Sequence, residues 1–157
     1  FFNVYGPNEY HKDRMASVVF HAFNQYKESK QIKLFKSEHP SYKDGMQVRD
    51  FIYVKDAVKV VIFFLNNSKF SGVYNVGTGN PETFKALAEA VLSNNTGNPD
   101  EIKYINMPND LKGKYQYYTK ARIDKIRSIG FDDNFKNLNE GVTDYLKNYL
   151  LTSDRYA

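Results

Sequence analysis

The chain has 157 residues, of which 41% are hydrophobic and 16% aromatic, so one domain can bury about 70% of its unfolded surface. It contains no Cys, which excludes a disulfide framework and a thiolate zinc site, and no metal site is expected. The net charge of +4 admits an anionic partner, but the Lys residues are interspersed with acidic residues, which is typical of an ordinary solvated surface.

Two features of the chain bear on its surroundings. The longest uninterrupted apolar run, Val60–Leu65, has six residues, far below the ~20 needed to span a bilayer, so no membrane partner is expected. The chain also opens on apolar residues, without an initiator Met or a polar lead-in. We therefore expect further sequence to precede Phe1.

The first predicted elements are a short apolar strand, Phe1–Val4, and an amphipathic helix over residues 15–27. The Gly6-Pro7 step ends the strand, and a charged loop leads into the helix. The helix is predicted from apolar residues that recur with a period near 3.6, namely Met15, Val18, Val19, Ala22 and Tyr26.

The middle of the chain predicts two strands and a helix. Ile32–Phe35 is a short strand, residues 36–47 form a loop, and residues 48–54 form a second strand. Asp56 is expected to cap a helix, Ala57–Leu65, that is apolar on nearly all sides and should therefore be buried.

The last part of the chain continues this alternation. The predicted elements are strands 72–76 and 102–105, a helix 84–93 capped by Thr83, a short helix to Ile126 capped by Thr119, and a final helix opened by a capping box of Asn137 and Glu140. Strands that alternate with helices, without a Pro/Gly-rich linker, predict an α/β or α+β fold in one unit.

Polar residues near the N-terminus are candidates for chemistry. Arg14, Ser17, His21 and Asn24 are spaced to share the helix face opposite the apolar stripe, which favours either a polyhydroxylated anionic ligand or a solvated face. Lys12 is the best candidate for an acid/base group, because partial burial or a nearby cation can lower a lysine pKa toward neutrality. Most loop lysines, however, are merely solvated.

Three later motifs each admit two interpretations. Arg49 lies in an apolar strand, where a cation needs an anionic partner, either Asp50 or a ligand phosphate. The residues 77–79, Gly-Thr-Gly, have the wrong spacing for a phosphate loop and are expected to form a tight turn. Lysines flank a group of three aromatic residues, Tyr115, Tyr117 and Tyr118. These are either a base-stacking surface for single-stranded nucleic acid or aromatic residues of the core and its rim.

Several motifs together resemble a known family. FFNVYGP, followed by HK and MASV, then RDFIYVKD, YNVGTG and a closing amphipathic helix, is similar to the C-terminal half of the extended short-chain dehydrogenase/reductase superfamily. The resemblance covers essentially the whole chain. RDFIYVKD and NVGTG are shared widely by sugar-nucleotide epimerases and dehydratases, whereas the MASVVFH block and LKGKYQYYT resemble the family of ADP-heptose epimerases.

The resemblance implies an α/β fold made of the C-terminal part of an NAD(P)-binding Rossmann fold plus a smaller α/β substrate-binding domain. The glycine-rich fingerprint and a catalytic Tyr-x-x-x-Lys would lie upstream, so residues 1–157 alone are expected to be inactive. The implied cofactor is NADP, with NAD possible, and the implied substrate is ADP-heptose, transiently oxidised at its sixth carbon for lipopolysaccharide inner-core synthesis. The resemblance also implies a cytoplasmic homo-oligomer, a pentamer, without nucleic-acid or membrane partners.

The same resemblance implies the site residues. Lys12 would be catalytic, as the second acid/base group, and would approach the cofactor together with Val4. Arg49 would meet the phosphates of the substrate, and residues 35–38 would cradle its nucleotide. The substrate-binding residues implied are Asn3, Arg14, His21, Phe35, Lys36, Ser37, Glu38, Arg49 and Tyr115.

The chain departs from the family pattern at three places. Arg14 stands where a small Ser is usual, Lys36-Ser37-Glu38 replaces Glu-Gly-Ser, and the loop from His39 to Gln47 is a few residues longer. The alternatives within enzymes are another sugar-nucleotide epimerase or a dehydratase. A different class is a noncatalytic nucleic-acid-binding module built on the Tyr and Lys residues near position 115, although no recognised RNA-binding signature is present.

Overall fold

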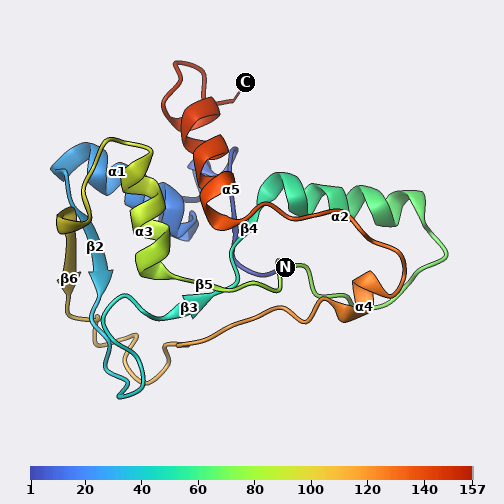
Figure 1. The fold of residues 1–157 in the computed structure, drawn as a ribbon, viewed down its shortest axis with the longest axis horizontal. Helices are drawn as coiled ribbons and strands as arrows, with labels where there is room; N and C mark the ends of the chain where they lie inside the picture. Colours follow the sequence, from blue (N-terminus) through green and yellow to red (C-terminus); the bar gives the residue numbers. More distant parts are fainter. Residues whose placement is uncertain (157) are drawn as a thin grey trace.

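The computed structural model describes residues 1–156 and has an α/β fold in which short strands alternate with helices. At one end of the molecule lie α1 (Val18–Ser29), α3 (Phe84–Ser93), β2 (Ile32–Phe35) and β6 (Ile102–Ile105) (Figure 1). At the other end lie α2 (Val54–Asn66) and α4 (Asp124–Arg127), and α5 (Leu138–Tyr145) lies between the ends.

The strands are short and pair two by two. β1 (Val4–Tyr5) pairs in parallel with β4 (Ile52–Tyr53), and β2 pairs in parallel with β6. β3 (Val48–Arg49) pairs antiparallel with β5 (Glu82–Thr83). The predicted strand 48–54 is therefore two strands in different sheets, because the chain between them turns the Asp50 side chain inward. The predicted first strand is also displaced, since it begins at Val4 rather than at Phe1.

The first helix begins at Val18 rather than at Met15. A 3-10 helix, η1 (Tyr10–Met15), precedes it, and Asp13 within η1 has a φ of 46°, which interrupts the helical path. Ser17 then caps α1 by accepting a hydrogen bond from the Phe20 amide at 3.2 Å. Met15 consequently leaves the apolar stripe and is 84% exposed. The buried members of the predicted stripe are Val19, Ala22 and Tyr26.

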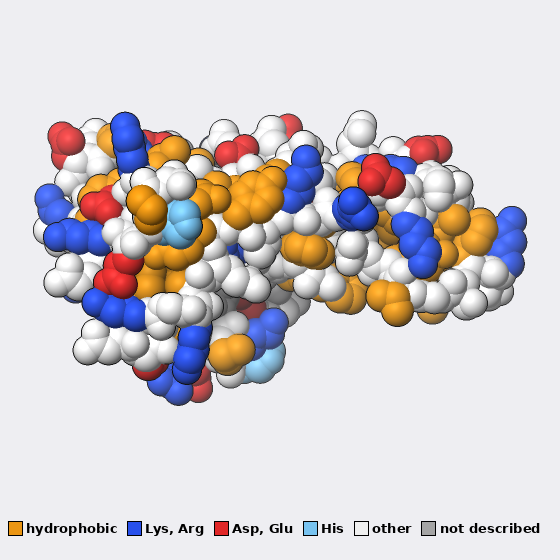
Figure 2. Space-filling view, turned by 90° about the horizontal axis from the view of Figure 1, so that it is seen from below, with side chains coloured by type: hydrophobic (Ala, Val, Ile, Leu, Met, Phe, Trp, Pro, Cys, Tyr) orange, Lys and Arg blue, Asp and Glu red, His pale blue; other side chains and the backbone are white. Residues whose placement is uncertain are grey.

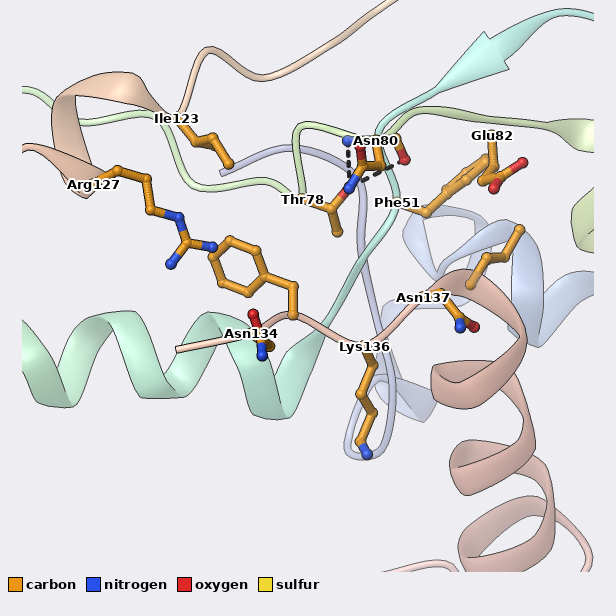
Figure 3. Close-up of a pocket in the computed structure, with 11 residues that line it drawn as sticks. Phe51, Thr78, Asn80, Glu82, Ile123, Arg127, Asn134, Lys136 and Asn137 are labelled. Atoms are coloured by element: carbon orange, nitrogen blue, oxygen red, sulfur yellow. Dashed lines mark hydrogen bonds between the residues drawn. The ribbon is translucent and has the colours of Figure 1, made fainter. Parts of the chain in front are cut away.

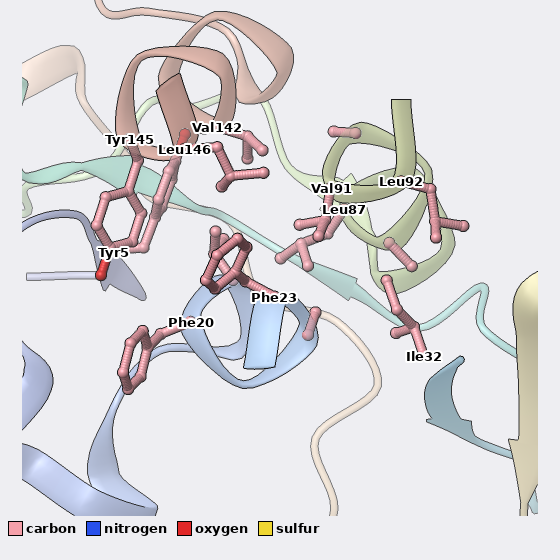
Figure 4. Packing of buried hydrophobic residues seen from close by; sticks show 14 of the residues in the cluster. Tyr5, Phe20, Phe23, Ile32, Leu87, Val91, Leu92, Val142, Tyr145 and Leu146 are labelled. Carbon is pink, nitrogen blue, oxygen red and sulfur yellow. The ribbon is translucent and has the colours of Figure 1, made fainter. Parts of the chain in front are cut away.

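The main hydrophobic core lies between α1, α3 and α5 (Figure 4). Phe23 of α1, Leu87 and Val91 of α3, and Val142 of α5 are almost completely buried there. Burying one such side chain fully stabilises the fold by about 1.5–3 kcal/mol, so this packing fixes the helices that carry the site.

Two predicted helix caps are confirmed. The Thr83 hydroxyl accepts a hydrogen bond from the Ala86 amide at 3.0 Å, at the start of α3. Asn137 and Glu140 form a reciprocal capping box, with both bonds at 2.9 Å, at the start of α5. The chain continues from α5 into a π-helical turn, Leu146–Leu150.

The predicted cap of α2 is wrong. The helix begins at Val54, directly after Tyr53, so Asp56 lies inside the first turn instead of before it. The buried Asp56 carboxylate pairs with the Lys59 ammonium at 2.7 Å and accepts a hydrogen bond from the Lys136 amide at 2.7 Å. Asp56 therefore ties α2 to the segment before α5 rather than capping it.

The predicted full burial of α2 is also wrong. One side of the helix packs, where Ala57 and Val60 join Ile126 and Phe131 in a second hydrophobic cluster. The other side has no covering element among residues 1–156, because this part of the chain offers a partner surface for one face only. The exposed apolar residues of that side are Val58, Val61, Ile62 and Leu65.

Two other predicted elements do not form. Residues 72–76 belong to no strand of the described chain, although the Val76 carbonyl accepts a hydrogen bond at 2.8 Å from the amide of Phe2, which precedes β1. Thr119 does not cap a helix, since α4 begins only at Asp124. The Thr119 amide instead donates to the Val48 carbonyl at 3.2 Å, next to β3.

The surface carries no large patch of one charge on the face shown in Figure 2. Lys and Arg side chains are dispersed among Asp and Glu there, as the sequence predicts. Within residues 1–156, no helix has the length and hydrophobicity needed to cross a bilayer.

Candidate functional site

A buried carboxylate joins three segments at the base of the site. Asp50 is fully buried and accepts hydrogen bonds from the Thr78 amide and hydroxyl, both at 2.7 Å. It also accepts from the amides of Gly79 and Ala121, both at 2.9 Å. Charge-assisted bonds of this kind are the strong ones. The residues 77–79 are thus the predicted tight turn, and two of its amides are bound to protein rather than free for a phosphate.

Asp50 is therefore not the partner of Arg49. The Arg49 residue is 9% exposed, and its guanidinium donates to the Val48 carbonyl at 2.9 Å. The guanidinium carbon lies 5.6 Å from the Phe84 ring centroid and 5.2 Å from that of Tyr115. None of the ion pairs among the described residues includes Arg49.

The electrostatics of this position would suit an anionic ligand. Burial lowers the pKa of the Arg49 guanidinium from its ordinary value, yet an arginine stays protonated in proteins. A buried cation generally needs an anionic partner, and the planar guanidinium can bind carboxylate or phosphate with two parallel hydrogen bonds. The two aromatic rings beside Arg49 would limit the access of water to such an anion.

The surface around Arg49 continues into a cavity of about 220 Å³ at the ends of β1 and α1. Asn3, Val4, Phe51 and Phe84 line it, together with residues 15–19. The Asn3 side-chain amide donates to the Asp50 carbonyl at 3.1 Å, which fixes its orientation. Because ligand pockets usually measure about 300–1,000 Å³, this cavity fits one part of a larger ligand.

On the other side of Arg49, Tyr115 connects the guanidinium to the end of β2. The Tyr115 ring centroid lies 6.3 Å from that of Phe35 and 5.4 Å from that of Tyr117. Burial raises the pKa of the Tyr115 hydroxyl. The Glu38 amide donates to the Tyr117 hydroxyl at 3.2 Å. The structure thus brings Phe35, Glu38, Arg49 and Tyr115 into one neighbourhood, and their contacts with a substrate stay predictions.

The two residues between Phe35 and Glu38 are held by their backbone. The Lys36 amide donates to the Ile105 carbonyl at 2.8 Å, and the Ser37 amide donates to the Asp44 carboxylate at 2.7 Å. Lys36 is exposed and Ser37 is half-buried. Their proposed contacts with a nucleotide therefore stay predictions.

Lys12 and Arg14 lie on η1 and do not line the cavity. Both are exposed, and no ion pair among the described residues includes either of them. The end of η1 is anchored by the buried Glu9 carboxylate, which accepts hydrogen bonds from the Ser17 amide at 2.6 Å and hydroxyl at 2.7 Å. Since residues 15–19 line the cavity, Lys12 is close to it along the chain.

The predicted polar helix face does not exist as such. Arg14 lies on η1, and Ser17 is the residue before α1, so only His21 and Asn24 are on the helix itself. The prediction is wrong because the positive φ of Asp13 interrupts the helix that the spacing assumed. His21 is half-buried, and its contact with substrate stays a prediction, as does that of Arg14.

A second cavity, also of about 220 Å³, lies between residues 78–82, α4 and the start of α5 (Figure 3). Three of its polar side chains already have partners. Thr78 binds Asp50, Asn137 belongs to its capping box, and the Arg127 guanidinium donates to the Phe131 carbonyl at 2.6 Å. We conclude that these groups hold segments of the fold together.

Sequence reasoning did not single out Phe51 and Phe84. Both line the cavity at the ends of β1 and α1, and their ring centroids lie 5.6 Å apart. Phe51 lies between β3 and β4, Phe84 begins α3, and each directly follows a polar residue that was singled out, namely Asp50 or Thr83. An aromatic residue directly after a candidate polar residue is the sequence signal that could have identified Phe51 and Phe84.

Comparisons with known proteins give consistent results. The model of the NAD dependent epimerase/dehydratase family matches residues 1–77. The ADP-L-glycero-D-manno-heptose-6-epimerase of Fusobacterium nucleatum is 51% identical over 161 residues, which cover 99% of this chain and 48% of that protein. The chain therefore spans about half the length of the curated relatives that it matches.

Solved structures share the fold. The crystal structure of ADP-L-glycero-D-manno-heptose-6-epimerase from Helicobacter pylori aligns with a TM-score of 0.76 at 28% identity, covering 94% of this chain and 42% of that one. The dTDP-glucose 4,6-dehydratase of Bacillus anthracis, solved in complex with NAD, aligns with a TM-score of 0.73 at 20% identity, covering 96% of this chain and 43% of that one. At that lower identity, the likeness concerns the fold alone.

Proposed function

We propose that the chain, which has the Rossmann-like α/β fold of the NAD dependent epimerase/dehydratase family and matches the model of that family over residues 1–77, is the C-terminal portion of an ADP-heptose 6-epimerase. Residues 1–157 would comprise the end of the Rossmann sheet and the substrate-binding domain. The whole enzyme would interconvert ADP-D-glycero-D-manno-heptose and ADP-L-glycero-D-manno-heptose for lipopolysaccharide inner-core synthesis. Residues 1–157 alone would be inactive.

The surroundings of Arg49 are the observation that supports this function most. The guanidinium is buried between Phe84 and Tyr115 and pairs with no carboxylate among the described residues. A diphosphate would supply the missing anion, with strong charge-assisted hydrogen bonds. From there the adjoining cavity would hold the sugar near Asn3, and residues 35–38 would surround the nucleotide.

The residues present fit a cofactor that approaches from outside this chain. Val4 lines the cavity, and Lys12 is exposed a few residues before the part of the chain that completes it. When bound, NADP, with NAD as the alternative, would accept and return the hydride of the sixth carbon. The elements that bind most of it, a glycine-rich fingerprint and a Tyr-x-x-x-Lys, would precede Phe1.

Lys12 would handle the proton on one side of the reacting carbon. Each epimer presents its hydroxyl from a different direction, so two proton-handling groups on opposite sides suit the reaction. The upstream Tyr would be one of them. Lys12 can be the other because Glu9 anchors the end of η1 while the Lys12 side chain stays free to reach the substrate.

The exposed apolar side of α2 supports the proposed domain organisation. Val61 and Ile62 are about half exposed and Leu65 is 75% exposed, although full burial of such a side chain would stabilise the protein by about 1.5–3 kcal/mol. We propose that the other half of the full-length protein packs on this side. Assembly as a homo-oligomer, a pentamer, and a cytoplasmic location are proposals that rest on the family resemblance.

Binding measurements on the full-length protein test the function. Arg49→Ala should weaken binding of the ADP-sugar by about 2–4 kcal/mol while NADP affinity changes little. Arg49→Lys is the matched control, because it keeps the charge and loses the bidentate geometry. An ADP-sugar affinity that stays at the wild-type value in folded Arg49→Ala contradicts the phosphate site. Preferred binding of a UDP-sugar would indicate another sugar-nucleotide epimerase or a dehydratase, and preferred binding of a single-stranded oligonucleotide would indicate the nucleic-acid module.

A further inference from the structure

Three aromatic side chains meet at the edge of the nucleotide neighbourhood. The ring centroids of His39 and Tyr117 are 5.0 Å apart, those of His39 and Tyr42 are 5.3 Å apart, and those of Tyr42 and Tyr117 are 5.4 Å apart. His39 is exposed, and the two tyrosines are half-buried. This aromatic trio therefore presents ring surface to solvent, and the family resemblance gives none of its members a role.

The aromatic trio continues a line of contacts that begins at Arg49. The Arg49 guanidinium lies over the Tyr115 ring at 5.2 Å, and the Tyr115 ring lies 5.4 Å from that of Tyr117. Figure 1 shows the loop 36–47 beside the segment that carries the two tyrosines, at the lower left. From the cation outward, the surface thus changes from charged to aromatic, which matches a nucleotide from its phosphates to its base.

The loop holds the rings in place without a ligand. The Tyr42 amide donates to the His39 carbonyl at 3.1 Å, and the Ser41 amide donates to His39 Nδ1 at 3.2 Å. The Glu38 amide donates to the Tyr117 hydroxyl at 3.2 Å, which joins the loop to the opposite segment. Rings that are ordered beforehand cost less entropy on binding.

The hydrogen bond at His39 also leaves a donor for a base. Because Nδ1 accepts the Ser41 amide, the proton of the neutral imidazole is on Nε2. Adenine offers ring nitrogens as acceptors. Aromatic side chains that stack on a base, with a donor at their edge, recognise a nucleobase by its π-face and its acceptors.

We propose that His39, Tyr42 and Tyr117 stack on the adenine base of the substrate and favour a purine over a pyrimidine nucleotide. The inference rests on the proposed function, since the diphosphate has to lie at Arg49. The base would then be bound by residues in the part of the chain where the loop 39–47 is longer than the family pattern. The rings are inclined to one another by 35° to 71°, so a base can lie flat on only one of them, and a purine gains more from that contact than a pyrimidine because its π-face is larger.

The test compares ligands with and without a base on the full-length protein. Isothermal titration calorimetry would measure ADP, UDP and inorganic pyrophosphate on the wild type and on the variant His39→Ala/Tyr42→Leu. The wild type should bind ADP more tightly than UDP or pyrophosphate. The double variant should lose about 5- to 100-fold in ADP affinity, the range expected for stacking of one base, and keep its pyrophosphate affinity.

Control variants separate stacking from folding. Tyr118→Ala removes an exposed neighbouring ring that is not part of the aromatic trio and should leave ADP affinity unchanged. His39→Ala alone removes an exposed side chain and carries the test if the double variant does not fold.

Two outcomes overturn the inference in distinguishable ways. The stacking proposal is refuted if the wild type binds ADP and pyrophosphate equally well. It is also refuted if ADP affinity is unchanged in folded His39→Ala and in the double variant. Neither result contradicts the phosphate site at Arg49. If the wild type binds none of the three ligands, the proposed function fails and the inference fails with it.

Discussion

Replacing Asp50 by Asn probes the part of the site that the other assignments depend on. Asn keeps one oxygen, which can still accept from Thr78, but it places an NH₂ donor where the carboxylate accepts the amides of Gly79 and Ala121 at 2.9 Å each. Two buried amides then lose their acceptor. An orphaned buried donor costs about 1–3 kcal/mol, so the free energy of unfolding should fall by about 2–6 kcal/mol.

Urea-induced unfolding of the full-length protein, followed by circular dichroism, would measure this loss in Asp50→Asn, in Arg49→Met and in the double variant. The Asp50 carboxylate and the Arg49 guanidinium form no hydrogen bond or ion pair with each other among the described residues, so the coupling between the two substitutions should stay below about 1 kcal/mol although the residues are neighbours in the chain. A coupling above about 1 kcal/mol would mean that guanidinium and carboxylate are partners. It would refute the assignment of Arg49 to a ligand phosphate.

Three further predictions concern other residues of the full-length protein. Lys12→Met should slow epimer interconversion by about 10²- to 10⁴-fold with little change in ADP-sugar affinity, and a change of only a few-fold would make Lys12 an ordinary loop lysine. Gly141→Ala should lower Tm by several degrees, because its Cβ collides with the Tyr5 hydroxyl, and an unchanged Tm would contradict the packing of α5 on β1. Burial raises the pKa of Asp144, but hydrogen bonds led by that of Lys55 outweigh it and hold this pKa below its ordinary value. The resulting stability is present above about pH 4 and lost as pH falls through the folded pKa, so Asp144→Asn should flatten the acid dependence of the urea midpoint below about pH 4.

Elements with local signals could be predicted from the sequence. The hydroxyl of Thr83 and the pair Asn137 and Glu140 act within one helical turn, so their patterns identify the starts of α3 and α5 correctly. The start of α1 could not be predicted, because the backbone of Asp13 and the buried Glu9 carboxylate decide it together. The hydrophobic periodicity of a sequence does not reveal contacts of this kind.

The same distinction applies to the site. Residue type alone identified Arg49, since a cation in an apolar strand needs a partner, but only the structure shows that Asp50 is bound elsewhere. The meeting of His39 with Tyr117 joins a loop to a distant segment and left no sequence signal. The apolar pattern of α2 predicted burial on nearly all sides, but residues 1–156 supply a partner for only one side.

Interconversion of the two ADP-heptose epimers tests the central claim most directly. The full-length protein would be incubated with NADP and pure ADP-D-glycero-D-manno-heptose, and the configuration at the sixth carbon followed by NMR. We predict that both epimers appear, that the same mixture forms from ADP-L-glycero-D-manno-heptose, and that no cofactor is consumed. Folded protein that binds the ADP-sugar and leaves its sixth carbon unchanged, or that releases a dehydrated sugar instead, would contradict the proposed function.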